Sequence, residues 1–322
     1  MKQLVYKNKP IGSINSLARV LGLQASRLIE IAENVQNFYS PNKPEIKPNG
    51  KIRQTYSVKD PLHKIQRKII DEIISGVDFP DYLQGSIKDP DNPRDYIQNA
   101  SLHAGRKVIL KEDISSFFPS IQEKLVLRVW KYFFKFPDDV AEILTKLTTY
   151  NGAIPEGSPT SSAIANLVFW DREPNLEYEL RQKGYVYSRY VDDITVSFAT
   201  RIEKKELQNI TTKIYRMFIN SGLKPNRKKR AVQTKNKRMR VHNLNVTSGK
   251  PTLPKSERAK IRAAVRELEL ISQSASSWGE IKNIYEQTNG RVNLMKRLHP
   301  DEAQKYVEKI KTIEKNWKTN TE

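Results

Sequence analysis

The chain has 322 residues, enough for two or three packed subdomains but with little room for additional catalytic modules. Its 56 Lys and Arg against 36 Asp and Glu give a formal charge of +20, which favours a phosphate-backbone partner over a small-molecule substrate. The absence of cysteine excludes disulfides, zinc fingers and a nucleophilic thiol. No apolar run approaches the ~18 residues that a membrane-spanning helix needs, and the first dozen residues lack the apolar core of a secretion signal. We therefore expect a cytoplasmic protein without a membrane partner.

The N-terminal region is predicted to be helical, because residues 13–38 carry apolar side chains near helical spacing. The segment 16–29 could also be half of a helix-turn-helix, but a helical extension packed on a larger domain explains the same pattern. Several prolines around residues 40–50 mark a loop and a boundary. Residues 1–46 are therefore expected to form an N-terminal helical extension.

The central region alternates predicted strands and helices. In chain order, the expected elements are a strand at 52–58, a helix at 63–74, a surface loop at 85–95, a buried strand at 107–114, a helical stretch at 122–150, a turn-rich segment at 151–160 and a helix running to about residue 183. Two strands at 185–191 and 194–198 then flank Asp192 and Asp193. This pattern predicts a hairpin with two carboxylates at its tip.

The last part of the chain is predicted to be a helical domain with basic faces. Residues 255–273 combine one apolar stripe with Arg258, Arg262 and Arg266 at a spacing of four residues. Residues 306–317 repeat this arrangement with neighbouring lysines. The alternative for each of these basic residues is an ordinary solvated helix surface.

Asp113, Asp192 and Asp193 are candidates for a nucleotidyl-transfer site. That chemistry uses two divalent ions roughly 4 Å apart, one activating the 3′-hydroxyl and the other neutralising the leaving pyrophosphate. Mg²⁺ keeps waters and substrate phosphates in its shell, so two or three carboxylates on rigid strands suffice. An ordinary turn pair is the alternative for Asp192 and Asp193, because Asp is common in turns.

Several motifs occur in the order found in reverse transcriptases. Arg189–Asp193 resembles their catalytic box, and Leu110–Ile121 resembles their first carboxylate motif. Ile154–Asn166 resembles the segment that shapes the nucleotide and template site, and Gly222–Lys229 resembles the motif after the catalytic hairpin. The resemblance implies an RNA-directed DNA polymerase that uses dNTPs.

This resemblance also implies an architecture and a cofactor. The fold class expected is α+β, arranged as a right hand. Interleaved fingers and palm would occupy residues 47–250, with the carboxylates on an antiparallel palm sheet. A helical thumb that binds RNA and duplex would occupy residues 251–322. Asp113, Asp192 and Asp193 would hold two Mg²⁺ ions, with Mn²⁺ as an alternative.

The resemblance places the nucleotide-binding residues at Lys51, Arg53, Phe118, Glu156, Gly157 and Lys229. Lys51 and Arg53 would hold the triphosphate. Phe118 would exclude a 2′-hydroxyl by its ring, with an ordinary core phenylalanine as the alternative. Lys229 is a candidate general acid for pyrophosphate, although Lys228 or Arg230 in the same basic run could serve. Glu156 replaces the glutamine usual in the family, so that an acid faces the nucleotide sugar.

Asn99–His103 matches the Asn-Ala-x-x-His element of retron reverse transcriptases, and Gly290–Trp317 is similar to the thumb of bacterial reverse transcriptases. Retron enzymes copy part of their own structured non-coding RNA into a branched RNA–DNA product, msDNA. They prime from a guanosine 2′-hydroxyl and act with an effector protein, encoded nearby, in antiphage defence. These partners are implied by the resemblance alone.

The residues expected to contact RNA or duplex are Asn99, His103, His242, Asn243, Arg258, Arg262 and Arg266. Val241–Asn243 stands where many retron enzymes carry Val-Thr-Gly, which leaves the cognate RNA and the retron subgroup open. One alternative is another prokaryotic reverse transcriptase, related to group II intron or other defence enzymes. Another is a catalytically silent RNA-binding or helix-turn-helix protein, which the intact carboxylates disfavour.

Overall fold

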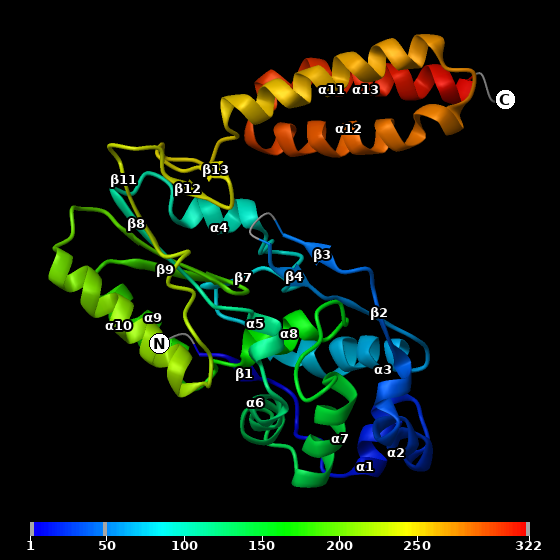
Figure 1. The fold of residues 1–322 in the computed structure, drawn as a ribbon, viewed down its shortest axis with the longest axis vertical. Coiled ribbons are helices and arrows are strands. Elements are labelled where there is room, and N and C mark those ends of the chain that lie inside the picture. The colour runs from blue at the N-terminus through cyan, green and yellow to red at the C-terminus, as the bar shows by residue number, and fades with distance from the viewer. Residues whose placement is uncertain (1–2, 48–49, 320–322) are drawn as a thin grey trace. The chain divides into compact units, whose positions relative to one another are not determined.

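The structure is a computed structural model and describes residues 3–47 and 50–319 (Figure 1). The chain divides into two compact units. The larger unit contains the chain up to Asn99 together with Val108–Val232, and the smaller unit contains Ala100–Lys107 and the chain from Gln233 onward. The boundaries expected for extension, fingers and palm, and thumb stay a prediction.

A five-stranded sheet organises the larger unit. Its strand order is β11-β8-β10-β9-β7, with β10 antiparallel to both β8 and β9, and β7 parallel to β9. The strands are β7 (Leu83–Gln84), β8 (Val108–Asp113), β9 (Val186–Tyr190), β10 (Asp193–Phe198) and β11 (Ala231–Thr234). β8 and β10 are buried along most of their length, as expected for central strands that are covered on both faces.

Helices surround this sheet, and Figure 1 shows α9 and α10 running side by side along it. The helices of this unit are α1 (Ile14–Leu21), α2 (Ala25–Glu33), α3 (Leu62–Lys68), α5 (Phe117–Ser120), α6 (Glu123–Arg128), α7 (Asp138–Thr148), α8 (Ser161–Leu167), α9 (Glu173–Gln182) and α10 (Lys204–Asn220), while α4 (Tyr96–Leu102) continues into the smaller unit. Short 3-10 segments lie at Val35–Phe38 and Ile74–Gly76, and π-helical segments lie at Ile69–Ile73 and Val129–Phe133.

The N-terminal helices share the hydrophobic core of the larger unit. Leu17 in α1 and Leu28 in α2 are fully buried in the same cluster as Leu144 in α7 and Phe218 in α10. Burial of these side chains against α7 supports the packed extension rather than a separate helix-turn-helix. In the described part of the larger unit, three two-stranded pairs lie outside the main sheet: β1 (Val5–Tyr6) with β6 (Val77–Asp78), β2 (Tyr39–Pro41) with β5 (Tyr56–Val58), and β3 (Glu45–Ile46) with β4 (Ile52–Arg53).

The smaller unit combines a short hairpin with three long helices that pack on one another. The hairpin consists of β12 (Arg240–Val241) and β13 (Leu244–Asn245), and the helices are α11 (Lys255–Ser274), α12 (Trp278–Leu298) and α13 (Pro300–Thr319). Each helix buries one apolar stripe and leaves its polar face to solvent, which is the pattern of a bundle. The predicted apolar stripe of residues 255–273 is confirmed at Ile261, Val265 and Leu268.

Several predicted elements are confirmed, and others are divided into two shorter elements in the structure. The strand at 107–114, the hairpin that carries Asp192 and Asp193, and the helix at 255–273 are present. The helix expected over 13–38 is interrupted at Gly22, whose φ of 69° ends α1 in a left-handed cap. The helix expected to run to residue 183 is two helices, because the chain turns at residues 168–172. The strand expected at 52–58 is likewise two short strands.

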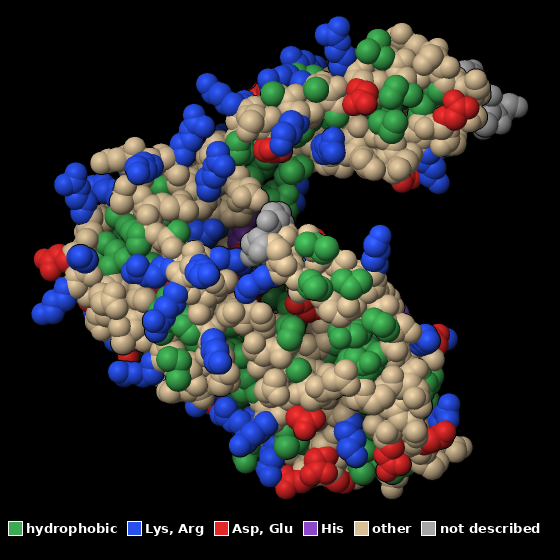
Figure 2. Space-filling model, viewed as in Figure 1, with side chains coloured by type: hydrophobic (Ala, Val, Ile, Leu, Met, Phe, Trp, Pro, Cys, Tyr) green, Lys and Arg blue, Asp and Glu red, His purple; other side chains and the backbone are tan. Residues whose placement is uncertain are grey.

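Charge is unevenly distributed over the surface. Figure 2 shows Lys and Arg side chains spread over much of the face in view, while Asp and Glu gather mainly near the end of the larger unit that holds α7. Within residues 3–47 and 50–319, no helix has the length and apolar character needed to cross a membrane.

Candidate active site

Three carboxylates meet where β8 and β9 end and β10 begins. The antiparallel register places Asp193, the first residue of β10, directly opposite Asp113, the last residue of β8. Asp192 lies immediately before Asp193, in the turn that follows Tyr190. The local fold therefore brings Asp113, Asp192 and Asp193 to one edge of the sheet.

The turn that carries Asp192 is held by a buried arginine. Val191 has a φ of 57°, which is strained for a β-branched residue and needs support from its surroundings. Arg189 supplies this support, because its fully buried guanidinium donates to the Val191 carbonyl oxygen at 3.0 Å. The same guanidinium forms a bidentate pair with buried Glu173 at 2.7 and 2.8 Å and donates to the Asn166 carbonyl oxygen at 2.9 Å. The hairpin tip is therefore anchored to α8 and α9.

The carboxylates at the tip repel one another. Burial, followed by the charges of Asp193 and Asp113, raises the pKa of Asp192 to about 6. Burial and the charge of Asp113 also raise the pKa of Asp193. A cation among these groups would offset both effects.

Asp113 is held by the segment that precedes β11. Lys229 donates to its Oδ1 at 2.7 Å, and Asn226 donates through its side chain to Oδ2 at 2.8 Å. The backbone N–H of Asn226 also donates to the Asp113 carbonyl oxygen at 2.8 Å. This places Lys229, a predicted general acid, beside the carboxylates.

A cleft of about 740 Å³ opens beside these carboxylates. Its lining includes seven of the residues predicted to bind metal or nucleotide: Lys51, Arg53, Asp113, Phe118, Glu156, Asp192 and Lys229. Phe118 is half-buried, with its ring centroid 5.8 Å from that of Phe117, so it contributes both to the cleft wall and to the core. The geometry fits both interpretations of Phe118 given above.

Arg53 and Glu156 form an ion pair in this cleft. The hydrogen bond that Arg53 donates to Glu156 raises the pKa of Arg53. Backbone pairing holds the two segments together, because Tyr56 donates its N–H to the Glu156 carbonyl oxygen at 2.8 Å. Gly157 completes the contact: its φ is 106°, and a Cβ there would lie 2.5 Å from the Tyr56 carbonyl oxygen. Gly157 thus has a packing role in addition to its predicted place near the nucleotide.

The predicted RNA-contacting residues have different surroundings. Asn99 on α4 and His103, directly after α4, are both fully buried, so neither offers a free surface. Burial, with the nearby charges of Arg106 and His242, lowers the pKa of His103 to about 3 and keeps its imidazole neutral. His242 and Asn243 form the turn between β12 and β13, with φ values of 46° and 65°. The structure therefore brings His103 and His242 together within the smaller unit.

The arginine stripe of α11 is partly engaged inside the bundle. Arg258 and Arg262 both pair with Glu302 of α13, the latter at 3.1 Å. Arg266 is exposed, and among the described residues it has no ion-pair or hydrogen-bond partner. Of the three arginines predicted to contact duplex, Arg258 and Arg262 thus share the Glu302 carboxylate and Arg266 is unpaired.

The donor set fits a divalent cation completed by substrate rather than a closed protein cage. No group of three or more His, Cys, Asp or Glu side chains in the described part of the chain is arranged to hold a metal ion. The raised pKa values of Asp192 and Asp193 show that burial and mutual repulsion outweigh the nearby positive charges of Lys111 and Lys229. Asp113 and Asp192 line one cleft, where waters and triphosphate oxygens can complete an Mg²⁺ shell.

A buried acid next to Asp113 was not anticipated from the sequence. Glu112 lies on the opposite face of β8 and accepts from Thr211 and Tyr215 of α10 at 3.1 and 3.0 Å, and from Arg230 at 3.1 Å. Consecutive acids on β8 thus pair with the consecutive bases Lys229 and Arg230. The only sequence signal was an acid inside an otherwise apolar strand, which requires a partner when buried.

The comparisons with known proteins agree with this geometry. Residues 42–249 match the family model described as reverse transcriptase (RNA-dependent DNA polymerase). The retron Se72 reverse transcriptase of Salmonella heidelberg (strain 579083-10) is 33% identical, over 91% of this chain and 77% of that protein. The retron Ec48 reverse transcriptase of Escherichia coli is 29% identical, over 95% and 77%.

Among solved structures, telomerase from Candida albicans in complex with a fragment of telomeric RNA matches with a TM-score of 0.47 and 10% identity. That match covers 88% of this chain and 58% of the telomerase chain, and it is too distant to add to the assignment. The family model and the retron relatives suffice without it. The chain therefore belongs to the retron reverse transcriptases and is an RNA-directed DNA polymerase.

Proposed function

We propose that this enzyme copies part of a cognate structured non-coding RNA into msDNA, a branched RNA–DNA product. Synthesis starts from a guanosine 2′-hydroxyl of that RNA, and the complex acts in the cytoplasm with a nearby-encoded effector in antiphage defence. Two observations support the proposal: similarity to retron enzymes over most of the chain, and the Asn99–His103 element of this subgroup.

The observation that supports the catalytic assignment is the convergence of Asp113, Asp192 and Asp193 at one edge of the sheet, where Asp113 and Asp192 line the cleft. When bound, two Mg²⁺ ions, or Mn²⁺ in their place, activate the attacking hydroxyl and neutralise the pyrophosphate. Asp113 and Asp192 would hold these ions, and Asp193 would have a more peripheral share in the site. Lys229, which donates a hydrogen bond to Asp113, would give a proton to the leaving pyrophosphate.

The incoming dNTP is proposed to lie in the same cleft. Lys51 and Arg53 supply positive charge for the triphosphate, and Phe118 lies below the sugar, where a 2′-hydroxyl would collide with its ring. In this scheme, the larger unit provides fingers and palm. The α11–α13 bundle provides a thumb that holds the duplex.

The decisive experiment is sequencing of the nucleic acid that copurifies with the protein expressed with its flanking genomic DNA. We expect one RNA species covalently joined to DNA, with a 2′,5′ linkage that a debranching enzyme cleaves. Linear DNA with a free 5′ end would contradict the priming proposal. Absence of DNA synthesis on any RNA template would contradict the catalytic assignment as well.

A further inference from the structure

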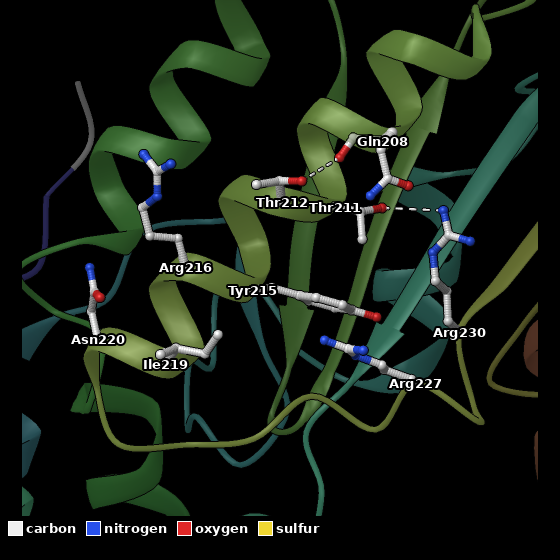
Figure 3. A pocket seen from close by; sticks show the side chains of 9 residues that line it. All are labelled: Gln208, Thr211, Thr212, Tyr215, Arg216, Ile219, Asn220, Arg227 and Arg230. Atoms are coloured by element: carbon white, nitrogen blue, oxygen red, sulfur yellow. Dashed lines mark hydrogen bonds between the residues drawn. The ribbon is translucent and has the colours of Figure 1, made fainter.

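A second cavity lies on the outer face of α10, apart from the catalytic cleft. It measures about 570 Å³ and shares none of its lining residues with the catalytic cleft. Seven of these residues come from two adjacent rows along α10 and two from the segment before β11: Gln208, Thr211, Thr212, Tyr215, Arg216, Ile219, Asn220, Arg227 and Arg230 (Figure 3). The volume falls within the range of small-molecule and nucleotide sites.

The segment that forms one wall alternates between the two cavities. Asn226 and Lys229 face the catalytic cleft and bind Asp113, whereas Arg227 and Arg230 face the α10 cavity. β8 does the same, because Asp113 faces the cleft and Glu112 binds side chains of the α10 cavity. The α10 cavity is therefore built on the reverse side of the same strand that carries the catalytic acid.

The cavity is strongly basic. Its lining holds three arginines and no acid, and the buried carboxylate behind it, Glu112, is already bound by Arg230. Arg216 has no carboxylate partner among the described residues, and Arg227 has only the ring of Tyr215, 5.9 Å from its guanidinium carbon. Elsewhere on α10, Lys213 is paired with Glu179. Unpaired guanidiniums beside hydroxyl and amide groups favour a phosphate-bearing ligand.

The ring of Tyr215 indicates a second property of the ligand, a base that can stack. Figure 3 shows the Tyr215 ring beside Arg227, with Gln208 and Thr211 further along the helix. The Tyr215 hydroxyl is committed to Glu112, which fixes the ring in place. A fixed ring with a stacked guanidinium is a surface for nucleobases, which are available for stacking in single strands. Exposed Ile219, 60% accessible, extends the apolar part of this surface.

We propose that the outer face of α10 is a second nucleic-acid site that takes nucleotide units of a single-stranded RNA segment. Phosphates lie on Arg216 and Arg227, and a base stacks beside Tyr215. The row from Gln208 to Asn220 is roughly 18 Å long, which is longer than one nucleotide and favours a strand over a free nucleotide. The proposal rests on the RNA-directed polymerase assignment only for the identity of the strand as RNA.

The test is arginine footprinting on the full chain with phenylglyoxal, followed by mass spectrometry of the Arg216 and Arg227 peptides. The probes are a single-stranded RNA 12-mer and, separately, AMP at the same nucleotide concentration. We expect the RNA to abolish modification of both arginines, with exposed Arg19 of α1 as the unchanged reference. If AMP protects the two arginines as well as RNA does, the site binds a free nucleotide and the proposed strand is wrong. If neither probe protects them, the proposed site is wrong altogether. No polymerisation is required, so failure here is distinct from failure of the catalytic proposal.

A salt titration of RNA binding provides the second measurement. Loss of two phosphate contacts in the Arg216→Ala, Arg227→Ala double variant should flatten the log-log salt dependence by about 1.4 units, at ~0.7 per contact on a single strand. The matched control is Lys204→Ala, Lys205→Ala, which removes the same charge from the exposed first turn of α10, outside the cavity. Equal effects in both double variants would reduce the proposal to general electrostatic attraction and overturn it.

Discussion

Burial and the charges of two neighbouring acids disfavour the ionised form of Asp192, so its proposed catalytic role can be tested separately from its effect on stability. We expect Asp192→Asn to reduce DNA synthesis to below about a hundredth of wild type, because a divalent ion loses a charged ligand. The variant should nevertheless unfold at the same or a higher temperature without metal, since one repulsive charge is gone. Primer extension on an RNA template and thermal unfolding would check the two expectations. Substantial polymerisation at saturating Mg²⁺ would contradict the metal assignment.

Glu156 is expected to act through Arg53 rather than on the chemistry itself. Its carboxylate is ion-paired with the Arg53 guanidinium, which is proposed to bind triphosphate, and it adds a negative charge to the cleft. We therefore predict that Glu156→Gln lowers the KM for dNTP by roughly three- to tenfold with little change in kcat. Single-nucleotide incorporation at varied dNTP concentration would measure this.

The control for that prediction is Glu45→Gln. Glu45 lies 3.8 Å from Arg53 but is largely exposed, so solvent screens its charge. Its replacement should leave KM nearly unchanged. A KM that rises in Glu156→Gln would show that the carboxylate is needed to orient Arg53, and the proposed competition would be wrong.

The β9–β10 hairpin depends on a partner outside it, because Arg189 of β9 is bound by Glu173 of α9. Arg189→Met removes the donor to the Val191 carbonyl and leaves the buried Glu173 without its positively charged partner, with the Tyr187 hydroxyl still donating to it. We expect a loss of about 3–5 kcal/mol in the free energy of unfolding, as is typical when one partner of a buried pair is removed. Urea unfolding would measure the loss.

The double variant Arg189→Met, Glu173→Met separates the loss of stability from the loss of the hydrogen bond to Val191. It should regain most of the stability, because neither charge is then buried alone. DNA synthesis should remain impaired, since the Val191 carbonyl still lacks its donor. Full activity in the stable double variant would show that the turn at Val191 does not need this support.

The same hairpin illustrates what the sequence could predict. Alternating β-branched and aromatic residues around Asp192 and Asp193 were sufficient to predict two strands and a tip, because this pattern depends only on local side-chain periodicity. The anchoring of Arg189 to Glu173 could not be predicted, since it joins residues of β9 and α9 through tertiary packing. Glu112 was missed for the same reason: its partners lie about 100 residues away.

The α11 helix shows a second limit of sequence patterns. A spacing of four residues correctly placed Arg258, Arg262 and Arg266 along one side of a helix. It did not reveal that α13 would bring Glu302 beside the first two. Periodicity defines a face but not the neighbour that covers it.

At the scale of the whole molecule, the formal charge of +20 predicts strong, salt-dependent binding to nucleic acid. The charge alone does not say which residues contribute. Basic side chains that already have a carboxylate partner release fewer counterions on binding than unpaired ones, because the phosphate must compete with that partner. The α11 stripe contains both kinds within three helical turns.

We therefore predict different effects for single substitutions in this stripe. Arg266→Ala should flatten the log-log salt dependence of RNA–DNA duplex binding by about 0.9 unit, the value for one phosphate contact on a B-form duplex. Arg258→Ala should change the slope less and lower the melting temperature instead, since it removes an ion pair between α11 and α13. Duplex affinity at several salt concentrations and thermal unfolding of both variants would test this, with Lys260→Ala, an exposed lysine paired with Glu257, as the charge-matched control. If Arg266→Ala and Lys260→Ala behave alike, the exposed end of the stripe faces solvent in the complex, and the proposed thumb would have to hold the duplex through another surface.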